Sequence, residues 1–175
     1  MAYNVYSEPG MRSKLVAAAN LPEYPAKGER KRRDEDWLRA LHGQGLSAFF
    51  NDLPATPDKL PQALAEFNRG QYWHCHETLE AIWLPERYPL RLFYHGLIKA
   101  AVGLLHLQRR NHHGGLVKLN DAKYTLAPFS PSFLGVDTAG LIEDVEHRLQ
   151  CINSGSGTDW TAVENLPAVQ IQMLV

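Results

Sequence analysis

Residues 64–84, LAEFNRGQYWHCHETLEAIWL, decide the fold expected for this chain. Apolar residues recur at helical spacing on both sides of residues 68–70, which predicts two short helices joined by a turn at that point. In the second helix, expected from Tyr72 to Leu84, the apolar side chains sweep a broad arc at about 100° per residue. We therefore read the rest of the fold outward from this helix.

Polar residues interrupt that arc. His76 and Glu80 project from its middle and lie one turn apart on one face, because side chains at i and i+4 are neighbours, while Glu77 lies at its edge. A carboxylate that leaves water without a partner is strongly disfavoured or loses its charge. Glu80 is thus expected to be paired, protonated, metal-bound or beside a cavity. A buried His–Glu hydrogen bond that fixes helix packing and a functional pocket both remain open.

The composition is ordinary for a soluble globular protein. The 175 residues are 45% hydrophobic and 21% charged, with a formal net charge of −1, so one domain with tails is expected and neither nucleic acid nor a membrane is expected as a partner. No uncharged apolar run reaches the roughly 18 residues of a membrane span, and the first residues lack the pattern of a secretion signal. Cys75 and Cys151 match no metal or redox spacing. Together these features predict a cytoplasmic protein with reduced thiols.

The remaining segments predict an all-α fold with two tails. Residues 1–33, rich in Pro and Gly, are expected to form a flexible N-terminal arm, and residues 34–58 a short helix and a linker. Residues 59–153 predict a compact bundle of about five helices arranged as helical hairpins. Residues 154–175 are expected to be a spacer and an extended tail that lies on the bundle.

Within the bundle, helices are expected from near Pro61 and over Tyr72–Leu84, Leu90–Arg110, Leu116–Leu126 and Thr138–Ile152. The segment Leu90–Arg110 is the longest without proline and carries a single polar stripe, which predicts a central helix buried on most sides. Lys99, Arg91 or a histidine of this stripe is expected to pair with Glu80.

Two stretches, FNRGQYWHCHETLEAIW (residues 67–83) and RLFYHGLIKAAVGLLHLQRRNHHGGLVKL (residues 91–119), together resemble a bacterial and plastid family known only as domain of unknown function number 309. The resemblance covers roughly residues 60–152 and implies a compact helical bundle. The recurrent polar positions of the family fall on His76, Glu77, Glu80, Trp83, His106 and Asn111.

The chain departs from that family at two places. His95 and Lys99 stand where members tend to have glutamine, and the usual Arg-Gly-Asn turn reads RRN at residues 109–111. The first departure changes the chemistry of any pocket, and the second puts the backbone geometry of the turn in question. Because the family has no established activity, the resemblance implies a fold and a site and leaves the function open.

The HETLE motif raises a metal hypothesis. His76 and Glu80 could share a divalent ion, with His106 or His95 as a third ligand. The motif is neither the HExxH of zinc proteases nor the ExxH of di-iron bundles. His95 and His106 are about 16 Å apart along a helix, so one mononuclear site takes only one of them. The metal ligands of this hypothesis are His76, Glu80 and His106.

We expect a non-enzymatic binding or interaction protein with a polar His/Glu pocket between the helices at 72–84 and 90–110. It would take a small molecule or a protein as its partner and need no cofactor. The alternative is a small metal-dependent, hydrolase-like enzyme that uses the HETLE helix. Trp83 and Leu79 are expected in the core. The candidate site residues are His76, Glu77, Glu80, Trp83, His95, Lys99, His106 and Asn111.

Overall fold

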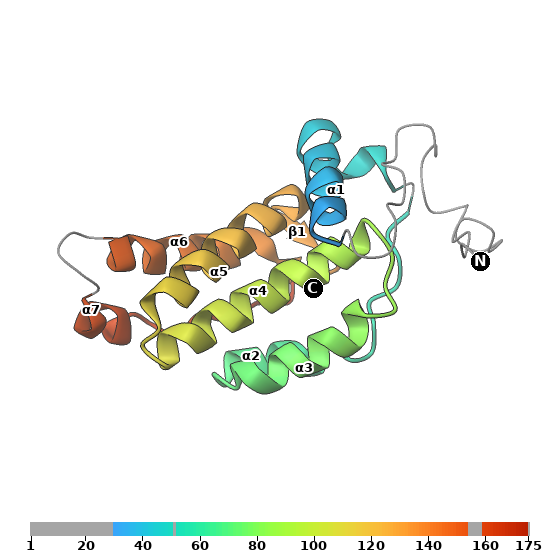
Figure 1. Cartoon of the computed structure of the whole chain (residues 1–175). Helices are drawn as coiled ribbons and strands as arrows, with labels where there is room; N and C mark the ends of the chain where they lie inside the picture. Colours follow the sequence, from blue (N-terminus) through green and yellow to red (C-terminus); the bar gives the residue numbers. More distant parts are fainter. Residues whose placement is uncertain (1–29, 51, 154–158, 175) are drawn as a thin grey trace. The chain divides into compact units, whose positions relative to one another are not determined.

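The computed structural model of the chain describes residues 30–50, 52–153 and 159–174 (Figure 1). These residues form seven α-helices, two short 3₁₀ helices and one β-hairpin. The chain divides into two compact units, Met1–Ala55 and Thr56–Val175. The expected flexible arm lies almost wholly outside the described residues. No helix in the described part is both long and apolar enough to span a membrane.

The first unit contains helix α1 (Arg30–Gln44) and the 3₁₀ helix η3 (Leu46–Ala48). Helix α1 begins at Arg30 rather than at Asp34, where the sequence predicts its start. Arginine and lysine are good helix formers, so the helix extends back into the basic cluster. The rings of Trp37 and Phe49 lie 5.9 Å apart, which ties the helix to the segment that follows it.

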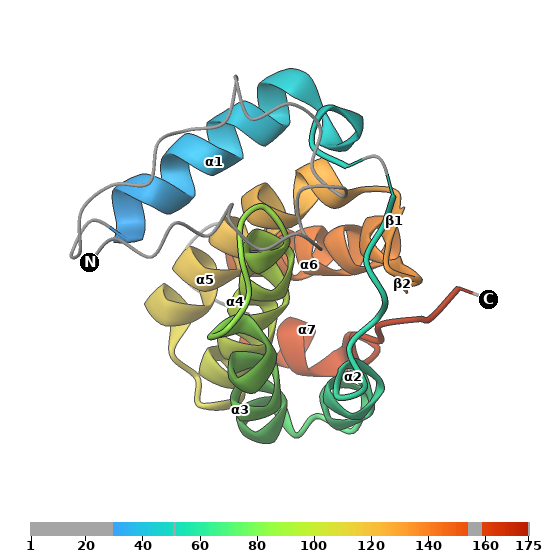
Figure 2. The same ribbon diagram turned by 90° about the vertical axis from the view of Figure 1, so that its right-hand side faces the viewer.

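The second unit contains the predicted bundle and one further helix. Its helices are α2 (Leu60–Asn68), α3 (Tyr72–Trp83), α4 (Leu90–Gln108), α5 (His112–Leu126), α6 (Thr138–Asn153) and α7 (Trp160–Asn165). Helix α4 lies between α3 and α5, and α6 packs on α5 (Figures 1 and 2). Helix α4 of the α4–α5 hairpin also packs against α3 of the α2–α3 hairpin, so it is the central helix, as the sequence predicts.

Helix α7 corrects the prediction of a spacer and a tail after α6. The Asp159 side chain accepts a hydrogen bond from the Ala162 amide at 3.0 Å and caps the helix, while Val163 is buried. Aspartate is a preferred N-cap residue because its oxygen satisfies an orphan amide. A six-residue helix has too few turns to show a period in the sequence.

Helix α5 begins at His112, four positions before the predicted start at Leu116. Asn111 caps it by accepting a hydrogen bond from the Gly114 amide at 2.9 Å. Glycine usually weakens a helix, but Gly115 leaves room for Leu107 of α4, whose side chain a Cβ at that position would overlap. Gly114 and Gly115 therefore lie within α5, where it approaches α4 closely, and do not break the helix.

Residues after α5 form a β-hairpin that the all-α prediction lacks. Strands β1 (Ser132–Phe133) and β2 (Val136–Asp137) pair antiparallel. The two residues between them, Leu134 and Gly135, have φ values of 48° and 75°. Positive φ at both central residues gives the twist that tight hairpins need. The hairpin is too short to show the alternating pattern of a strand.

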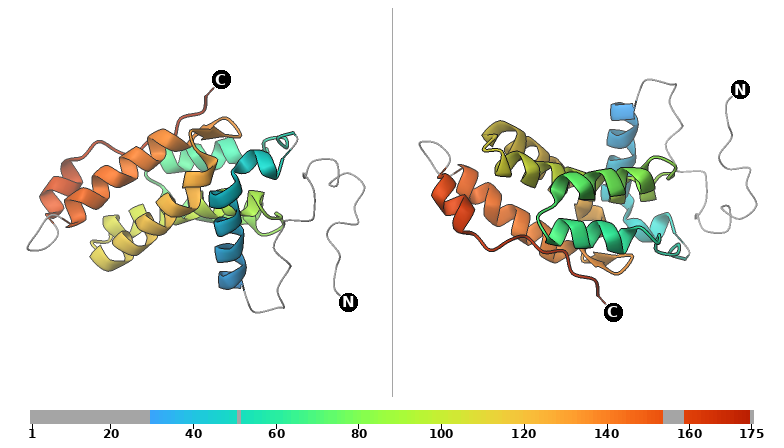
Figure 3. Two further views of the ribbon diagram at one scale, coloured as in Figure 1. Left: turned by 90° about the horizontal axis from the view of Figure 1, so that it is seen from above. Right: turned by 90° about the horizontal axis from the view of Figure 1, so that it is seen from below.

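The C-terminal tail lies on the second unit, as predicted (Figure 3). Asn68, at the end of α2, donates to the Ile171 carbonyl at 2.9 Å and accepts from the Ile171 amide at 2.7 Å. Met173 forms an antiparallel bridge with Val136 of β2. Val169 and Ile171 are buried, so the alternation in the tail reflects one face turned to the core.

Candidate functional site

Helix α3 presents two faces with different side chains. One is buried and carries Tyr72, Cys75, Leu79 and Ile82. A second row, spaced by three, four and three residues, carries Trp73, His76, Glu80 and Trp83. Residues three and four apart are neighbours on a helix surface, so this row is continuous along α3. We call these four residues the α3 stripe.

His76 and Glu80 form the polar centre of the α3 stripe. Nε2 of His76 lies 3.2 Å from Oε1 of Glu80, which confirms that the two side chains share one face. Glu80 is therefore paired, which is one of the expected arrangements, but its side chain is 43% exposed and has not left water. Glu80 directly follows the fully buried Leu79 and is turned by about 100° from it, which brings the carboxylate to the surface. A histidine of its own helix therefore pairs with Glu80.

The two nitrogens of the His76 ring have different environments. Nε2 is engaged by Glu80, and when it donates to that carboxylate, Nδ1 is left as an acceptor. Nδ1 is buried and has no hydrogen-bond partner among the described residues. The Trp73 ring lies 5.4 Å from the imidazole, measured between ring centroids. An exposed indole thus stands beside a His–Glu pair at one end of the stripe.

Trp83 links the α3 stripe to α4. Its ring centroid lies 5.2 Å from that of His95, and the guanidinium carbon of Arg91 lies 3.9 Å from the indole centroid, a cation–π geometry. Arg91 also donates from Nη1 to the carbonyl of Trp83 at 2.7 Å, where α3 ends. Trp83 is only partly buried, so its assignment to the core is wrong, whereas Leu79 is buried as predicted.

Lys99, on the predicted polar stripe of α4, reaches α5. Its Nζ donates to Oγ1 of Thr125 at 2.9 Å, and Thr125 in turn donates to the Asp121 carbonyl at 2.7 Å. Thr125 is fully buried, so this bond satisfies a polar group inside the α4–α5 contact. Lys99 thereby serves the packing of α5.

His106 and Asn111 meet at the turn between α4 and α5. Nδ2 of Asn111 lies 3.1 Å from Nδ1 of His106, and Oδ1 of Asn111 accepts from the Gly114 amide. A Cβ at Gly114 would lie 2.6 Å from the same His106 nitrogen. The two residues that the family resemblance singles out here therefore shape the turn.

The described residues contain no group of three or more His, Cys, Asp or Glu side chains placed to hold a metal ion. His76 and Glu80 are adjacent, but His106 lies with Asn111 at the α4–α5 turn. Protein metal sites usually need three or four protein ligands. The geometry thus gives no support to a centre built from His76, Glu80 and His106.

Burial shifts the pKa of two core groups of α3. It raises the pKa of the Cys75 thiol to about 12, and the nearby Glu66 carboxylate adds to the effect. It also raises the pKa of the Tyr72 hydroxyl. A thiol with so high a pKa is protonated at neutral pH and is a poor nucleophile. Cys75 therefore fills space in the core.

Comparison with known protein families identifies the central part of the chain. Residues 60–117 match the family model described as Domain of unknown function (DUF309). This segment is a DUF309 domain. No curated protein and no solved structure gives a match to the chain. The DUF309 domain runs from the first residue of α2 into α5 and contains every candidate site residue. Helices α6 and α7 and the tail lie outside it.

Sequence reasoning missed two features around the DUF309 domain. The helical period of the sequence places Trp73 in the apolar arc, yet 48% of this residue is exposed in the structure. Its position three residues before His76 was the available signal, because it puts the indole on the polar row. The second feature is the ion pair between Arg110 and Glu164, at 2.7 Å. Nothing local in the sequence joins two residues 54 positions apart.

Proposed function

We propose that this protein is a non-enzymatic binding protein that recognises a protein partner through its outer α3 surface. This surface consists of the α3 stripe together with Glu77 and Leu84. The observation that carries the proposal is the exposed indole of Trp73 beside the His76–Glu80 pair. Tryptophan is among the residue types most enriched at the positions that dominate interface energy. An indole left in water on a rigid helix is a large apolar anchor available to a partner.

A second apolar anchor lies at the other end of the same surface. Leu84 is 59% exposed and directly follows α3. Eleven positions separate it from Trp73, about three helical turns or 16 Å, and the two side chains point within about 20° of each other around the helix axis. His76 and Glu80 lie between them. Two apolar anchors around a polar centre suit recognition of an extended or helical segment.

The charge of this surface favours a basic partner. Glu77 is exposed, and Glu80 keeps 43% of its side chain accessible while it pairs with His76. A second copy of α3 laid against the first would set carboxylates against carboxylates, which disfavours self-association here. A segment with apolar side chains and interspersed Lys or Arg would complement the surface. We infer such a segment as the ligand.

The proposal keeps the binding role inferred from the sequence and moves it from a pocket between α3 and α4 to the surface of α3. The Trp83–Arg91–His95 cluster supports it, because these contacts hold the end of α3 against α4 and keep the recognition surface rigid. We also propose that the protein acts in the cytoplasm and does not bind nucleic acid. The sequence supports these two points, because Cys75 and Cys151 match no metal or redox spacing and the net charge is −1.

Site-specific crosslinking followed by a reconstituted binding assay tests the proposal. A photoreactive residue at Glu77 is expected to capture one discrete protein in cells, and the same residue at Asp121 on α5 is the control. The captured protein, identified and purified, is expected to bind the wild-type chain, and Trp73→Ala is expected to weaken the affinity at least about tenfold. Tyr124→Ala removes another exposed aromatic, 53% accessible, and is expected to leave the affinity unchanged.

Two results would overturn this function. One is an unchanged Kd for Trp73→Ala when the variant melts like wild type. The other is stoichiometric metal in the purified protein that is lost in a folded His76→Ala variant, which would instead support the metal-dependent enzyme.

A further inference from the structure

The two hairpin turns of the DUF309 domain lie side by side at one end of the bundle. Gln108, the last residue of α4, donates from Nε2 to the carbonyl of Gly70 in the α2–α3 turn at 3.1 Å. Arg69 belongs to that turn, and Arg109 and Arg110 belong to the α4–α5 turn. All three arginines are exposed. We call them the arginine end.

Arg110 is held in an unfavourable backbone conformation. Its φ is 52°, in the left-handed region that favours glycine. Helices commonly end with glycine at this position. An arginine is therefore kept here against the preference of the backbone, and strain of this kind concentrates at functional sites.

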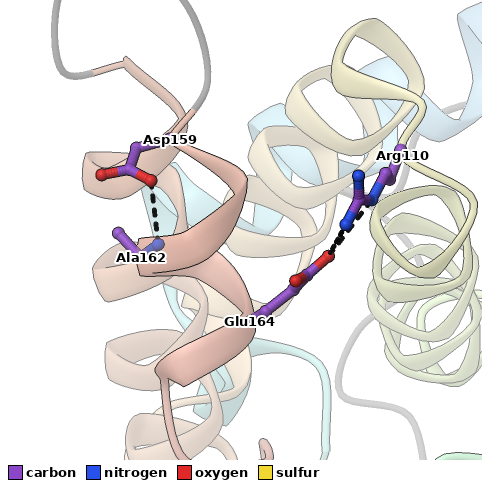
Figure 4. Close-up of polar contacts among 4 residues, drawn as sticks. All are labelled: Arg110, Asp159, Ala162 and Glu164. Atoms are coloured by element: carbon purple, nitrogen blue, oxygen red, sulfur yellow. Dashed lines mark hydrogen bonds and ion pairs between the residues drawn. The ribbon is translucent and has the colours of Figure 1, made fainter.

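The carboxylate of Glu164 forms an ion pair with the guanidinium of Arg110 (Figure 4). Nε and Nη2 of Arg110 both donate to Oε1 of Glu164, at 3.2 and 2.7 Å. The two side chains are 63% and 55% exposed. Exposed ion pairs are weak because water screens them, so a competing anion can reach the guanidinium. Glu164 thus fills the place of an anionic group.

The helix that carries Glu164 does not depend on this ion pair. Val163 of α7 is buried, and Asp159 caps the helix through the Ala162 amide (Figure 4). The Glu164 side chain can therefore turn away from Arg110 while α7 stays in place. Exchange of Glu164 for another anion requires only a change of side-chain rotamer.

We propose that the arginine end binds the phosphate group of a small phosphorylated molecule, which displaces Glu164 from Arg110. The planar fork of arginine matches phosphate with two parallel hydrogen bonds. A phosphate group carries up to about twice the charge of a carboxylate, so three nearby arginines favour it over Glu164. The net charge of −1 and the confinement of these arginines to one end favour a small ligand over a nucleic acid, which needs a longer basic surface.

Titration of the full chain with inorganic pyrophosphate tests this site, with the arginine Nε–Hε resonances followed by NMR. Saturable shifts are expected in the millimolar range or below. Glu164→Gln removes the competing charge and is expected to tighten binding about two- to fivefold. Arg110→Gly removes the guanidinium while glycine suits the backbone, and is expected to weaken binding about tenfold. Arg39→Ala removes an arginine of α1 that is 76% exposed and is expected to change nothing.

Several outcomes would overturn the assignment. Equal losses for Arg110→Gly and Arg39→Ala, or no saturation in wild type, would leave only non-specific charge attraction. Citrate that binds as tightly as pyrophosphate would show recognition of charge without preference for phosphate. A single-stranded oligonucleotide whose affinity rises with its length well above that of pyrophosphate would assign the arginine end to a polymer. An unchanged affinity in Glu164→Gln would remove the competitor role of Glu164.

Discussion

Arg110 takes at the end of α4 the backbone position that Gly70 takes at the end of α2. Both residues have a left-handed backbone conformation, with φ of 52° at Arg110 and 72° at Gly70. In each turn the amide of this residue and the next amide donate to carbonyls of the preceding helical turn, at 2.8 to 3.0 Å. This is the hydrogen-bond pattern of a Schellman motif. One backbone motif thus closes both hairpins, with glycine in one and arginine in the other.

Glycine at position 110 is expected to stabilise the protein once the ion pair is absent. In a Glu164→Gln background, Arg110→Gly should raise the free energy of unfolding by about 1 kcal/mol, because glycine adopts the left-handed backbone conformation without the steric cost of a side chain. Arg109→Gly is the matched control. Arg109 has φ of −90°, so glycine there only adds freedom to the unfolded chain and should cost about 0.5–1 kcal/mol. Denaturant melts compare the variants, and losses of similar size at both positions would contradict the strain at Arg110.

Gly103 is expected to be intolerant of even one added methyl group. A Cβ there would lie 2.6 Å from Cδ2 of Leu119 and 3.1 Å from its backbone nitrogen. Gly103→Ala gains helix propensity but forces α4 and α5 apart, and should cost about 1–3 kcal/mol in thermal or denaturant unfolding. Adding Leu119→Val should cost less in the alanine background than in wild type. Strictly additive losses would mean that the helices do not approach closely here.

Asn68 is expected to hold the tail on the bundle. Its side chain makes two hydrogen bonds to the backbone of Ile171, so Asn68→Ala leaves partly buried groups unpaired and should cost about 1–3 kcal/mol. Asn120→Ala is the control, because that exposed side chain donates to the Leu116 carbonyl of its own helix. Hydrogen exchange should show faster exchange of the Ile171 amide in Asn68→Ala. An unchanged exchange rate would mean that the other contacts of the tail, the Met173–Val136 bridge and the burial of Val169 and Ile171, hold it without Asn68.

The buried thiol of Cys75 is expected to make the protein less stable at alkaline pH. Burial raises the pKa of its thiol from 9.0 to about 12. The unfolded chain gives up this proton first, so between these pH values the folded state binds more protons and stability falls as pH rises. The stabilisation that the protonated Cys75 thiol contributes is fully present below about pH 9. Above that pH it is lost at up to about 1.4 kcal/mol per pH unit.

The unfolding free energy measured from pH 8 to 11 tests the role of Cys75. Cys75→Ala should show a shallower alkaline slope than wild type, while Cys151→Ala should keep the wild-type slope. Burial raises the pKa of Tyr94 alike in all three proteins. Burial also raises the pKa of Tyr72, and the Cys75 thiolate adds a smaller contribution, whose loss in Cys75→Ala acts in the same direction. Parallel slopes in all three would assign the effect to the tyrosines.

Glu80→Gln is expected to change stability by less than about 1 kcal/mol. The carboxylate pairs with His76 but is 43% exposed, and exposed pairs contribute little. Glu146→Gln, which breaks an ion pair with Lys123 of similar exposure, should behave alike in a thermal melt. A loss of several kcal/mol for Glu80→Gln alone would restore the interpretation of a buried structural hydrogen bond.

The sequence predicted helices best where a period ran for several turns. Helix α3 is expected over Tyr72–Leu84 and observed over Tyr72–Trp83, because its apolar residues define one face. The His76–Glu80 pair follows from the same spacing. The exposure of Glu80 does not, since a broad apolar arc does not show which part of it a neighbouring helix will cover. Trp73 and Trp83 lie in that arc, yet packing of α3 against α2 and α4 leaves about half of Trp73 exposed.

Local spacing by itself determined the α2–α3 and α4–α5 hairpins, the central place of α4 and the residues of the His–Glu pair, because helix periods and turn residues act over a few positions. Only the tertiary structure decided that Asn68 meets Ile171 and that Glu164 meets Arg110, 103 and 54 positions apart. These contacts depend on where each helix packs, and packing is chosen by the fit of whole apolar faces. The α3 surface and the arginine end exist for the same reason: both are what that packing leaves exposed.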